Sequence, residues 1–426
     1  MGTFGERRLR ILWVKADKIL PVHSGGNIRS YHILRQLASR QELIFFSYYG
    51  GEPDAEYEEE LSRQFPGAVC MYTGKRSPTR LSRSLDYIGR LPMKAPYAVS
   101  RFESVAVQSM LKSWFQEGRF DVTVCDFLDA AVNFPSHLTI PTALFQHNVE
   151  SEIWRRHALT ASNPARRFLY RVEFEKMLSY EQKMVRKFHH VIAVSEHDRK
   201  LMGDWTDFSR ITVVPTGVDL QQYRPDLSCR ADQRLVLFVG AMDWEPNVDA
   251  VEYFCREVWP SIQARVPESR FRIVGRNPVR RVQRLASRSI EVTGSVPSVE
   301  DHLREAAVVV VPLRVGGGTR VKIYEAMAAG KAVVSTSVGA EGLDVHHDLD
   351  IVLADDPGAF SGAVAKLLQN VELRGRYERA AAELVTKYDW AAIGDKFCEV
   401  LETLARNSSL DMGRDVESAY VADGRG

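Results

Sequence analysis

Short runs of apolar residues alternate along this chain with longer stretches in which apolar residues recur every third or fourth position. A short continuous apolar run is typical of a strand that is buried on both faces, and the longer period is typical of an amphipathic helix. The alternation predicts an α/β protein whose parallel sheets are covered by helices on both faces. The expected strands are 9–14, 42–49, 120–127, 141–148, 189–195 and 210–219 in the first half and 234–240, 269–275, 290–294, 306–313, 332–336 and 350–354 in the second, with helices that include 247–265, 298–305 and 319–329.

The length of the chain indicates more than one domain, because 426 residues are too many for one ordinary core. The alternation of strands and helices occurs twice, and a polar stretch at 219–233 separates the two halves. We therefore predict two doubly wound, Rossmann-like domains, residues 1–222 and 223–389. Residues 390–406 are expected to form a last helix, and the polar residues 407–426 a disordered tail.

Composition narrows the class of protein. The chain is 45% apolar and 26% charged with a net charge of +1, which is typical of a soluble globular protein and argues against nucleic-acid binding. Its five scattered cysteines, without a C-x-x-C motif, indicate reduced thiols in a cytoplasmic protein and no zinc site. The apolar runs at 9–14 and 306–313 are too short for a signal core or a membrane span, so any membrane contact would be peripheral, at the inner face.

A run of three glycines, 316–318, lies between an expected strand and an expected helix in LRVGGGTRVKIYEAMAAGKAVVST. A glycine loop that opens a helix exposes backbone N–H groups at the positive end of the helix dipole, which is an anion site suited to phosphate. Arg320 and Lys322 add positive charge in the first turn, where cations are unfavourable unless an anion is present.

Glu325 lies about one turn beyond these cations, where a carboxylate can accept hydrogen bonds from the two hydroxyls of a ribose. Phosphate donors followed by this carboxylate fit a nucleoside diphosphate. The alternative is a tight strand-to-helix turn with ordinary surface charges. The chain has neither GxxxxGK[ST] nor GxGxxG after the first strand, which argues against a P-loop NTPase and a nicotinamide enzyme.

Further polar residues follow expected strands in the first half. His147 ends a strand and could donate to an oxygen that carries developing charge, or could simply bond to backbone. Asp126 and Glu150 could orient a sugar hydroxyl or cap a helix. In the second half, Asp243, Trp244 and Asn247 could touch the donor, while Asn247 could equally be a helix N-cap.

Two basic stretches, 75–101 and 155–171, interleave Lys and Arg with Leu, Ile, Tyr and Phe. Such patches suit an anionic bilayer or a lipid-diphosphate acceptor. The alternative is a solvated face that is balanced by the acidic residues of 52–60.

The stretch GGGTRVKIYEAMAAGKAVVSTSVGAEGL resembles the C-terminal signature of glycosyltransferase family 4, which has the GT-B fold of two Rossmann-like domains facing a central cleft. The resemblance covers roughly residues 9 to 400, and it includes the segments GGNIR, FQHNVES, VIAVSEHD, VVPTGVD, FVGAMDWEPNVDAVEYF and VTGSVP.

In that family the C-terminal domain holds a nucleotide-activated sugar. The resemblance implies that Glu325 binds the ribose hydroxyls and that Thr293 to Val296 lie near the base through backbone groups. Residues that would line the sugar and the diphosphate are Gly316, Gly317, Gly318, Thr319 and Arg320.

The N-terminal domain of the family holds the acceptor. The resemblance implies that Gly25 and Gly26 approach the donor phosphate from across the cleft and that His147 reaches the donor sugar or phosphate. It also implies that the last helix, 390–406, crosses back to pack on the N-terminal domain.

The sequence departs from the family pattern at two places. Many members carry two glutamates eight positions apart, but here Gly317 occupies the first position, so only Glu325 remains. Many also carry an arginine and a lysine after the first strand of the second domain, where this chain reads GAMDWEPN. We infer that Arg320 and Lys322 supply the missing charge.

The resulting prediction is a retaining glycosyltransferase that uses a UDP- or GDP-sugar as donor substrate, without a tightly bound cofactor or a metal. His147, Arg320 and Lys322 are the expected catalytic residues. The acceptor would be a glycan or a lipid-linked carrier in exopolysaccharide or cell-surface glycan synthesis. The alternatives are a sugar-nucleotide epimerase of the GT-B type and a non-catalytic protein that binds sugar nucleotides.

Overall fold

The computed structural model describes residues 8–22, 24–74, 86–87, 89–90, 94–161, 163–225, 232–315 and 320–423. The chain forms two compact units. The N-terminal unit comprises the described residues up to Val214 together with those from Ile393 on, and the C-terminal unit is Pro215–Ala392.

The N-terminal unit is built on a parallel sheet with the strand order β3-β2-β1-β4-β5-β6-β7. Its strands are β1 (Arg10–Ala16), β2 (Glu42–Tyr49), β3 (Val69–Tyr72), β4 (Val122–Asp126), β5 (Thr142–Phe145), β6 (His190–Ala193) and β7 (Ile211–Val213). Its helices include α1 (Gly25–Ala38), α2 (Ala55–Gln64), α4 (Tyr97–Ser100), α5 (Val105–Glu117), α6 (Leu128–Ala131), α7 (Glu150–Thr160), α8 (Pro164–Lys187) and α9 (Glu196–Gly203).

The C-terminal unit has a second parallel sheet, in the order β10-β9-β8-β11-β12-β13. Its strands are β8 (Leu235–Val239), β9 (Arg270–Val274), β10 (Ile290–Gly294), β11 (Val308–Val311), β12 (Ala332–Ser335) and β13 (Val352–Leu353). Its helices include α10 (Glu245–Tyr253), α11 (Trp259–Arg265), α12 (Arg280–Gln283), α13 (Val299–Glu305), α14 (Val321–Ala328), α15 (Pro357–Gln369) and α16 (Val371–Val385), and α17 (Trp390–Asp423) leads back to the first unit.

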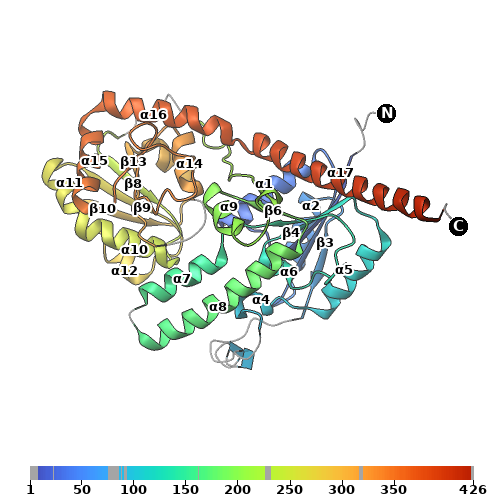
Figure 1. Ribbon diagram of the computed structural model, residues 1–426. Helices are drawn as coiled ribbons and strands as arrows, with labels where there is room; N and C mark the ends of the chain where they lie inside the picture. The colour runs from blue at the N-terminus through green and yellow to red at the C-terminus, as the bar shows by residue number, and fades with distance from the viewer. Residues whose placement is uncertain are drawn as a thin grey trace. The chain divides into compact units, whose positions relative to one another are not determined.

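Helices cover both sheets, as Figure 1 shows. Every residue of the central strands β4 and β11 is buried, which a strand achieves only when both faces of its sheet are covered. The predicted doubly wound α/β architecture is therefore confirmed. In each sheet the strand order reverses direction at one place, between β1 and β4 and between β8 and β11. Open α/β sheets bind ligands at the carboxyl ends of the strands at this switch point.

The apolar runs identified all twelve strands that we expected, with ends shifted by a few residues. Strand β3 was missed because it is a short edge strand whose residues are all only half-buried, so its apolar signal is brief. The helix expected at 247–265 is present as α10, a π-helical segment at Phe254–Val258 and α11.

The last helix is longer than predicted. Helix α17 continues to Asp423, so most of the tail at 407–426 that we expected to be disordered is helical. The reason is that this stretch contains no proline and a single internal glycine before Gly424, so little in it ends a helix. From Ile393 on, α17 belongs to the N-terminal unit, where the ring of Phe397 lies 5.4 Å from that of Trp13.

The two units divide after Val214, before the polar stretch in which we expected the boundary. The backbone N–H of Val218 donates to the carbonyl of Tyr388 at 2.8 Å, and Gly217 lies directly against the ring of Trp390. These contacts hold the start of the connecting segment on the C-terminal unit, which explains why the division lies closer to the N-terminus than we expected.

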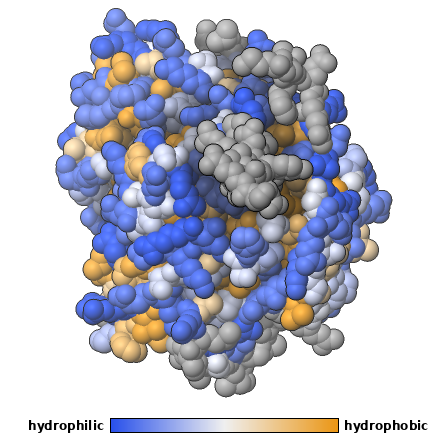
Figure 2. Space-filling view, turned by 45° about the vertical axis from the view of Figure 1, so that its right-hand side comes forward, coloured by the Kyte–Doolittle hydropathy of each residue, from blue (hydrophilic) through white to orange (hydrophobic). Residues whose placement is uncertain are grey.

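No helix within the described residues is long and apolar enough to cross a membrane. On the face of the molecule in Figure 2, hydrophobic residues form small groups among hydrophilic ones. The cysteines at 70, 125, 255 and 398 are free thiols.

Candidate functional site

The switch point of the C-terminal sheet brings the starts of α10 and α14 together. Gly240 follows β8, and a Cβ atom at this position would lie 2.6 Å from Asn247 Nδ2 and 2.8 Å from Lys322 Nζ. A Cβ atom on Gly275, which follows β9, would run into the carbonyl oxygen of Gly240. Only glycine fits the backbone contact at position 275, whereas a Cβ atom at position 240 would displace the ends of the Asn247 and Lys322 side chains, so the two glycines line the floor of the site.

Lys322 on α14 bridges this floor. Its Nζ donates to Asn247 Oδ1 at 2.9 Å and lies 4.6 Å from the centre of the Phe238 ring. Burial, together with the positive charge of Arg320, lowers the pKa of Lys322 to about 7, while Glu325 acts in the opposite direction. A cation held in this way is stabilised by a bound anion.

Arg320 lies at the N-cap position of α14 and is almost fully buried, with its guanidinium 5.9 Å from the centre of the Trp244 ring. Two cations therefore meet at a helix N-terminus beside the sheet switch point, which is a favourable place for a phosphate group. The glycine loop at 316–319, which we expected to line the diphosphate, lies outside the described residues.

Glu325 lies on α14 one turn after Lys322, as predicted. The hydroxyl of Tyr223 donates to its Oε1 at 3.0 Å, and burial raises the pKa of the Glu325 carboxyl. A carboxylate offers about four acceptor positions on its two oxygens, so Tyr223 leaves capacity for two further hydroxyl donors. Sequence analysis missed Tyr223 because it lies in the polar segment that we assigned to a linker.

Asn247 is the third residue of α10, whereas Trp244 holds the N-cap position. The alternative that Asn247 is an N-cap is therefore wrong. Asn247 instead donates to the carbonyl of Ala241 at 2.9 Å and accepts from Lys322, which fixes the loop after β8. Asp243 accepts a hydrogen bond from Asn277 Nδ2 at 2.9 Å.

Thr293 lies near the end of the edge strand β10, and Val296 follows that strand; both are half-buried. The Thr293 hydroxyl lies 3.0 Å from the carbonyl oxygen of Gly294, so its side chain is engaged with backbone. Both residues belong to the unit that carries Glu325, at the carboxyl ends of the strands.

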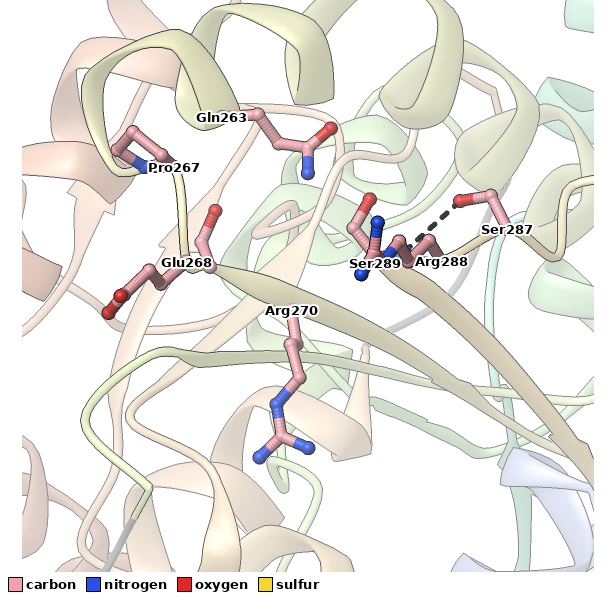
Figure 3. Close-up of a pocket in the computed structure, with 8 residues that line it drawn as sticks. Gln263, Pro267, Glu268, Arg270, Ser287, Arg288 and Ser289 are labelled. Atoms are coloured by element: carbon pink, nitrogen blue, oxygen red, sulfur yellow. Dashed lines mark hydrogen bonds between the residues drawn. The ribbon is translucent and has the colours of Figure 1, made fainter.

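An open cavity of about 560 Å³ lies elsewhere in the C-terminal unit (Figure 3). Arg270 and Ser289, which line it, stand at the amino ends of β9 and β10, the edge opposite to Glu325. Arg270 is paired with Asp232, and in Figure 3 its guanidinium extends away from Ser287 and Ser289. This cavity therefore lies apart from the residues predicted to bind the donor.

The N-terminal unit has its own polar cluster at the carboxyl ends of β1, β4 and β5. Asp126, at the end of β4, is 1% exposed. Its Oδ1 lies 2.7 Å from His147 Nε2, and its Oδ2 lies 3.4 Å from Lys15 Nζ and accepts from Trp13 Nε1 at 3.0 Å. The alternative that Asp126 caps a helix is wrong, because its acceptors are used inside this cluster.

The protonation of the cluster follows from its electrostatics. Burial would raise the pKa of Asp126, but Lys15 and the hydrogen bond from His147 overcome it, so that the pKa lies below its ordinary value. Burial lowers the pKa of His147 to about 4 despite the favourable effect of Asp126. A neutral His147 therefore donates from Nε2 to the ionised carboxylate, which leaves Nδ1 as a hydrogen-bond acceptor. Within the described part of the chain, this buried Nδ1 has no hydrogen-bond partner.

The predicted glycines at the start of α1 are close to this histidine. A Cβ atom on Gly26 would lie 3.9 Å from the His147 ring, and Ser24 caps the helix by accepting from Asn27 N–H at 3.2 Å. Arg29, which sequence analysis missed, donates to the carbonyl of His147 at 2.9 Å and to that of Gly25 at 3.2 Å. The helix start and His147 are thus held as one unit.

Glu181 on α8 anchors the segment after His147. Its carboxylate accepts from the backbone N–H groups of Glu150 and Ser151, at 2.9 and 3.1 Å, and from Gln146 Nε2 at 3.1 Å. Glu150 is the first residue of α7 and not its cap, since Glu181 satisfies the start of this helix. Burial raises the pKa of Glu150 to about 8 and that of Glu181 to about 7.

Within the described residues, no group of three or more His, Cys, Asp or Glu side chains is arranged to hold a metal ion.

Comparisons with known proteins identify the family. The Glycosyltransferase Family 4 model matches residues 23–222, and the Glycosyl transferases group 1 model matches residues 233–370. The phosphatidyl-myo-inositol mannosyltransferase of Mycobacterium leprae is 27% identical over 339 residues, which are 75% of this chain and 83% of that protein. The D-inositol 3-phosphate glycosyltransferase of Thermobispora bispora is 28% identical over 218 residues, 45% of this chain and 50% of that protein.

Solved structures share the fold at low sequence identity. Sucrose-phosphate synthase from Thermosynechococcus elongatus has a TM-score of 0.68 at 17% identity, covering 93% of this chain and 99% of that one. The Anabaena protein HepE in complex with UDP and glucose has a TM-score of 0.65 at 13% identity, covering 93% and 100%. Both likenesses show the two-domain GT-B fold. The chain belongs to the group 1 glycosyltransferases of family 4.

Proposed function

We propose that this glycosyltransferase moves a sugar from a nucleoside diphosphate sugar to an acceptor hydroxyl with retention at the glycosidic carbon. The observation that carries the proposal is the cluster of Arg320, Lys322 and Glu325 at the switch point of the C-terminal sheet. Two cations suit a diphosphate, and a carboxylate one turn away suits a ribose.

In this proposal the positive charge of Arg320 and Lys322, already present at the site, neutralises the negative charge of the diphosphate. Arg320 and Lys322 stabilise the negative charge that grows on the phosphate as the glycosidic bond breaks. Binding of the diphosphate would restore the full positive charge of Lys322, whose pKa is lowered by burial and by Arg320.

The carboxylate of Glu325 would accept from the ribose hydroxyls, with Tyr223 holding it in position. Residues 316–319 would line the sugar and the diphosphate, and the backbone at Thr293 and Val296 would contact the base. The donor would be a UDP- or GDP-sugar; the UDP complex of a protein with this fold supports a uridine nucleotide.

The N-terminal unit would bind the acceptor and contribute His147. We expected His147 to donate a hydrogen bond, but its Nε2 is engaged with Asp126, so we propose instead that Nδ1 accepts from a sugar hydroxyl. Gly25 and Gly26 would admit the donor phosphate close to the start of α1. Retention agrees with the family resemblance, in which the leaving phosphate takes the proton of the acceptor.

The proposed biological setting is the synthesis of an exopolysaccharide or another cell-surface glycan in the cytoplasm, on a glycan or lipid-linked acceptor. The named activities of the inositol-lipid and inositol-phosphate relatives support a polyhydroxylated acceptor that carries phosphate.

The test is a transfer assay with a panel of UDP- and GDP-sugars and a bacterial lipid extract as the source of acceptor. We expect nucleoside diphosphate release from one donor to depend on the extract, and NMR of the product to show the anomeric configuration of the donor. Glu325→Gln should lose this release, while Glu257→Gln, an exposed residue, should retain it. An epimerised sugar nucleotide formed without acceptor would contradict the proposal.

A further inference from the structure

Helices α7 and α8 form a hairpin in the N-terminal unit, side by side in Figure 1. Three aromatic rings tie the two helices together near the turn. The ring of Tyr170 on α8 lies 6.1 Å from that of Trp154 and 5.5 Å from that of His157, both on α7. Asn163 caps α8 by accepting from the backbone N–H of Ala165 at 2.9 Å, which satisfies the start of this helix.

The end of this hairpin exposes large apolar side chains. Leu159 in the last turn of α7 is 68% exposed, and on α8 Phe168 is 67% and Leu169 is 37% exposed. Of the eight large apolar side chains that are exposed in the described part of the chain, these three fall within eleven consecutive residues. Exposed apolar residues that cluster in this way mark an interaction surface.

The same segment is strongly basic. Residues 153–172 contain Arg155, Arg156, Arg166, Arg167 and Arg171 and no Asp or Glu, although the whole chain has a net charge of only +1. Some of this charge is internally engaged. The Arg155 guanidinium pairs with Glu152 at 2.7 Å, and that of Arg167 donates to the carbonyl of Ala161 at 2.9 Å. Arg166 and Arg171 are exposed and flank Phe168 in the sequence of α8.

We propose that the end of the α7–α8 hairpin, residues 155–161 and 163–171, docks on the surface of an anionic lipid bilayer. Phe168, Leu169 and Leu159 would enter the boundary between head groups and acyl chains, while Arg166 and Arg171 would contact lipid phosphates. This occupant meets both properties of the surface, because a bilayer offers apolar depth beside negative charge. A second copy of the chain would bring like charges together, which disfavours self-association through this surface.

The hairpin belongs to the unit to which the proposed function assigns the acceptor. Docking would therefore hold the acceptor-binding unit at a membrane from which a lipid-linked acceptor is drawn. The docking surface itself depends on no residue of the proposed donor site, so the two proposals can fail separately.

The test is co-sedimentation of the full chain with vesicles, without any nucleotide. One set of vesicles is phosphatidylcholine alone, and the other contains phosphatidylglycerol as well. We expect binding to the anionic vesicles only, weakening as salt is raised, because each arginine near the surface is worth roughly fivefold in affinity. The double variant Arg166→Gln/Arg171→Gln should bind about 30-fold more weakly.

The apolar contribution is tested separately. Phe168→Ser should weaken binding to anionic vesicles by about tenfold or more, because the ring no longer enters the lipid. Val105→Ser removes a side chain that is 77% exposed on α5, and Arg284→Gln removes an exposed arginine of the C-terminal unit, so both controls should bind like the unchanged chain. Circular dichroism of each variant checks that it is folded.

Either of two results would overturn the proposal. The first is equal binding of the folded hairpin variants and the controls to anionic vesicles. The second is that the unchanged chain does not bind vesicles. This second result includes the case in which the surface joins two copies of the chain, so that the chain is a dimer in solution and Phe168→Ser converts it to a monomer. Nucleotide binding by the hairpin variants should be unchanged, which separates this result from the donor site.

Discussion

The buried lysine of the donor site predicts that the affinity for a nucleoside diphosphate sugar depends on pH. Burial, with the repulsion of Arg320, lowers the pKa of Lys322 to about 7 in the free protein. The lysine is then charged in about half of the molecules at pH 7 and in about one in a hundred at pH 9. A diphosphate next to Nζ favours the charged form, so binding takes up a proton above pH 7.

The magnitude follows from this fraction. If the bound lysine stays charged throughout, the dissociation constant rises by up to about 50-fold between pH 7 and pH 9, which is roughly 2 kcal/mol of binding free energy. The diphosphate of the nucleotide sugar does not titrate in this range, since it has no terminal phosphate with a second pKa near 6. The part of the pH dependence that disappears in Lys322→Met therefore reports on the lysine.

Isothermal titration calorimetry at a series of pH values measures this change, and buffers of different ionisation enthalpy count the proton that is taken up. Lys322→Met should bind more weakly at pH 7 and lose the pH dependence. Lys366→Met, which changes an exposed lysine on α15, is the matched control and should behave like the unchanged chain. A dissociation constant that stays within about twofold from pH 7 to pH 9 would refute the placement of Lys322 at the diphosphate.

Three further predictions concern the architecture of the two sites. Asp126→Ala removes one partner of a buried ion pair and should lower the free energy of unfolding by about 3–5 kcal/mol in chemical denaturation. Asp121→Ala, in a more exposed pair, should lower it by about 1 kcal/mol or less, and equal losses would contradict the buried cluster. Gly275→Ala places a Cβ atom against the Gly240 carbonyl, so differential scanning calorimetry should show a C-terminal unit that is less stable by about 1–3 kcal/mol. Titration calorimetry should show weaker nucleotide binding, and an alanine variant that binds normally would exclude the close approach. Burial raises the pKa of Glu181 from 4.5 to about 7, so its protonated form contributes up to about 3 kcal/mol of stability that is fully present below pH 4.5 and is lost as the pH rises through 7. Glu181→Gln should flatten this part of the dependence of unfolding free energy on pH, and an unchanged slope would contradict the role of Glu181.

The fold was largely predictable from the sequence because both sheets are parallel and buried. Strands such as 308–311 read as continuous valine, and no antiparallel pairing obscured the pattern. The edge strand β3 and the extension of α17 beyond residue 406 were harder, since a half-buried strand has a weak apolar signal and residues 407–423 are largely polar.

Part of the candidate site was also predictable, because its residues are close in sequence. Lys322 and Glu325 are three positions apart on α14, a spacing that brings their side chains together on a helix, and Arg320 directly precedes this helix. Their partners could not be found in this way. Tyr223 reaches Glu325 across 102 positions and Asn247 reaches Lys322 across 75, and these distances are closed only by tertiary packing.

The role of His147 shows the same limit. Its position at the end of a strand was clear from the sequence, but its donor and acceptor atoms depend on Asp126 at the end of the neighbouring strand β4. Sheet order decides this pairing, and with it the inference that Nδ1 accepts a hydrogen bond.

The central claim is that the C-terminal unit binds a nucleoside diphosphate through Glu325 and the two cations. The most direct measurement is a calorimetric titration of the unchanged chain, Glu325→Ala and Glu257→Ala with UDP, GDP and their sugars. We predict that one nucleotide binds tightly, that Glu257→Ala leaves this binding intact, and that Glu325→Ala weakens it by at least about tenfold, because hydrogen bonds to a charged group are worth about 1.5–3 kcal/mol each. Equal affinity in the folded Glu325→Ala variant, or no binding of any of these nucleotides to the unchanged chain, would contradict the account.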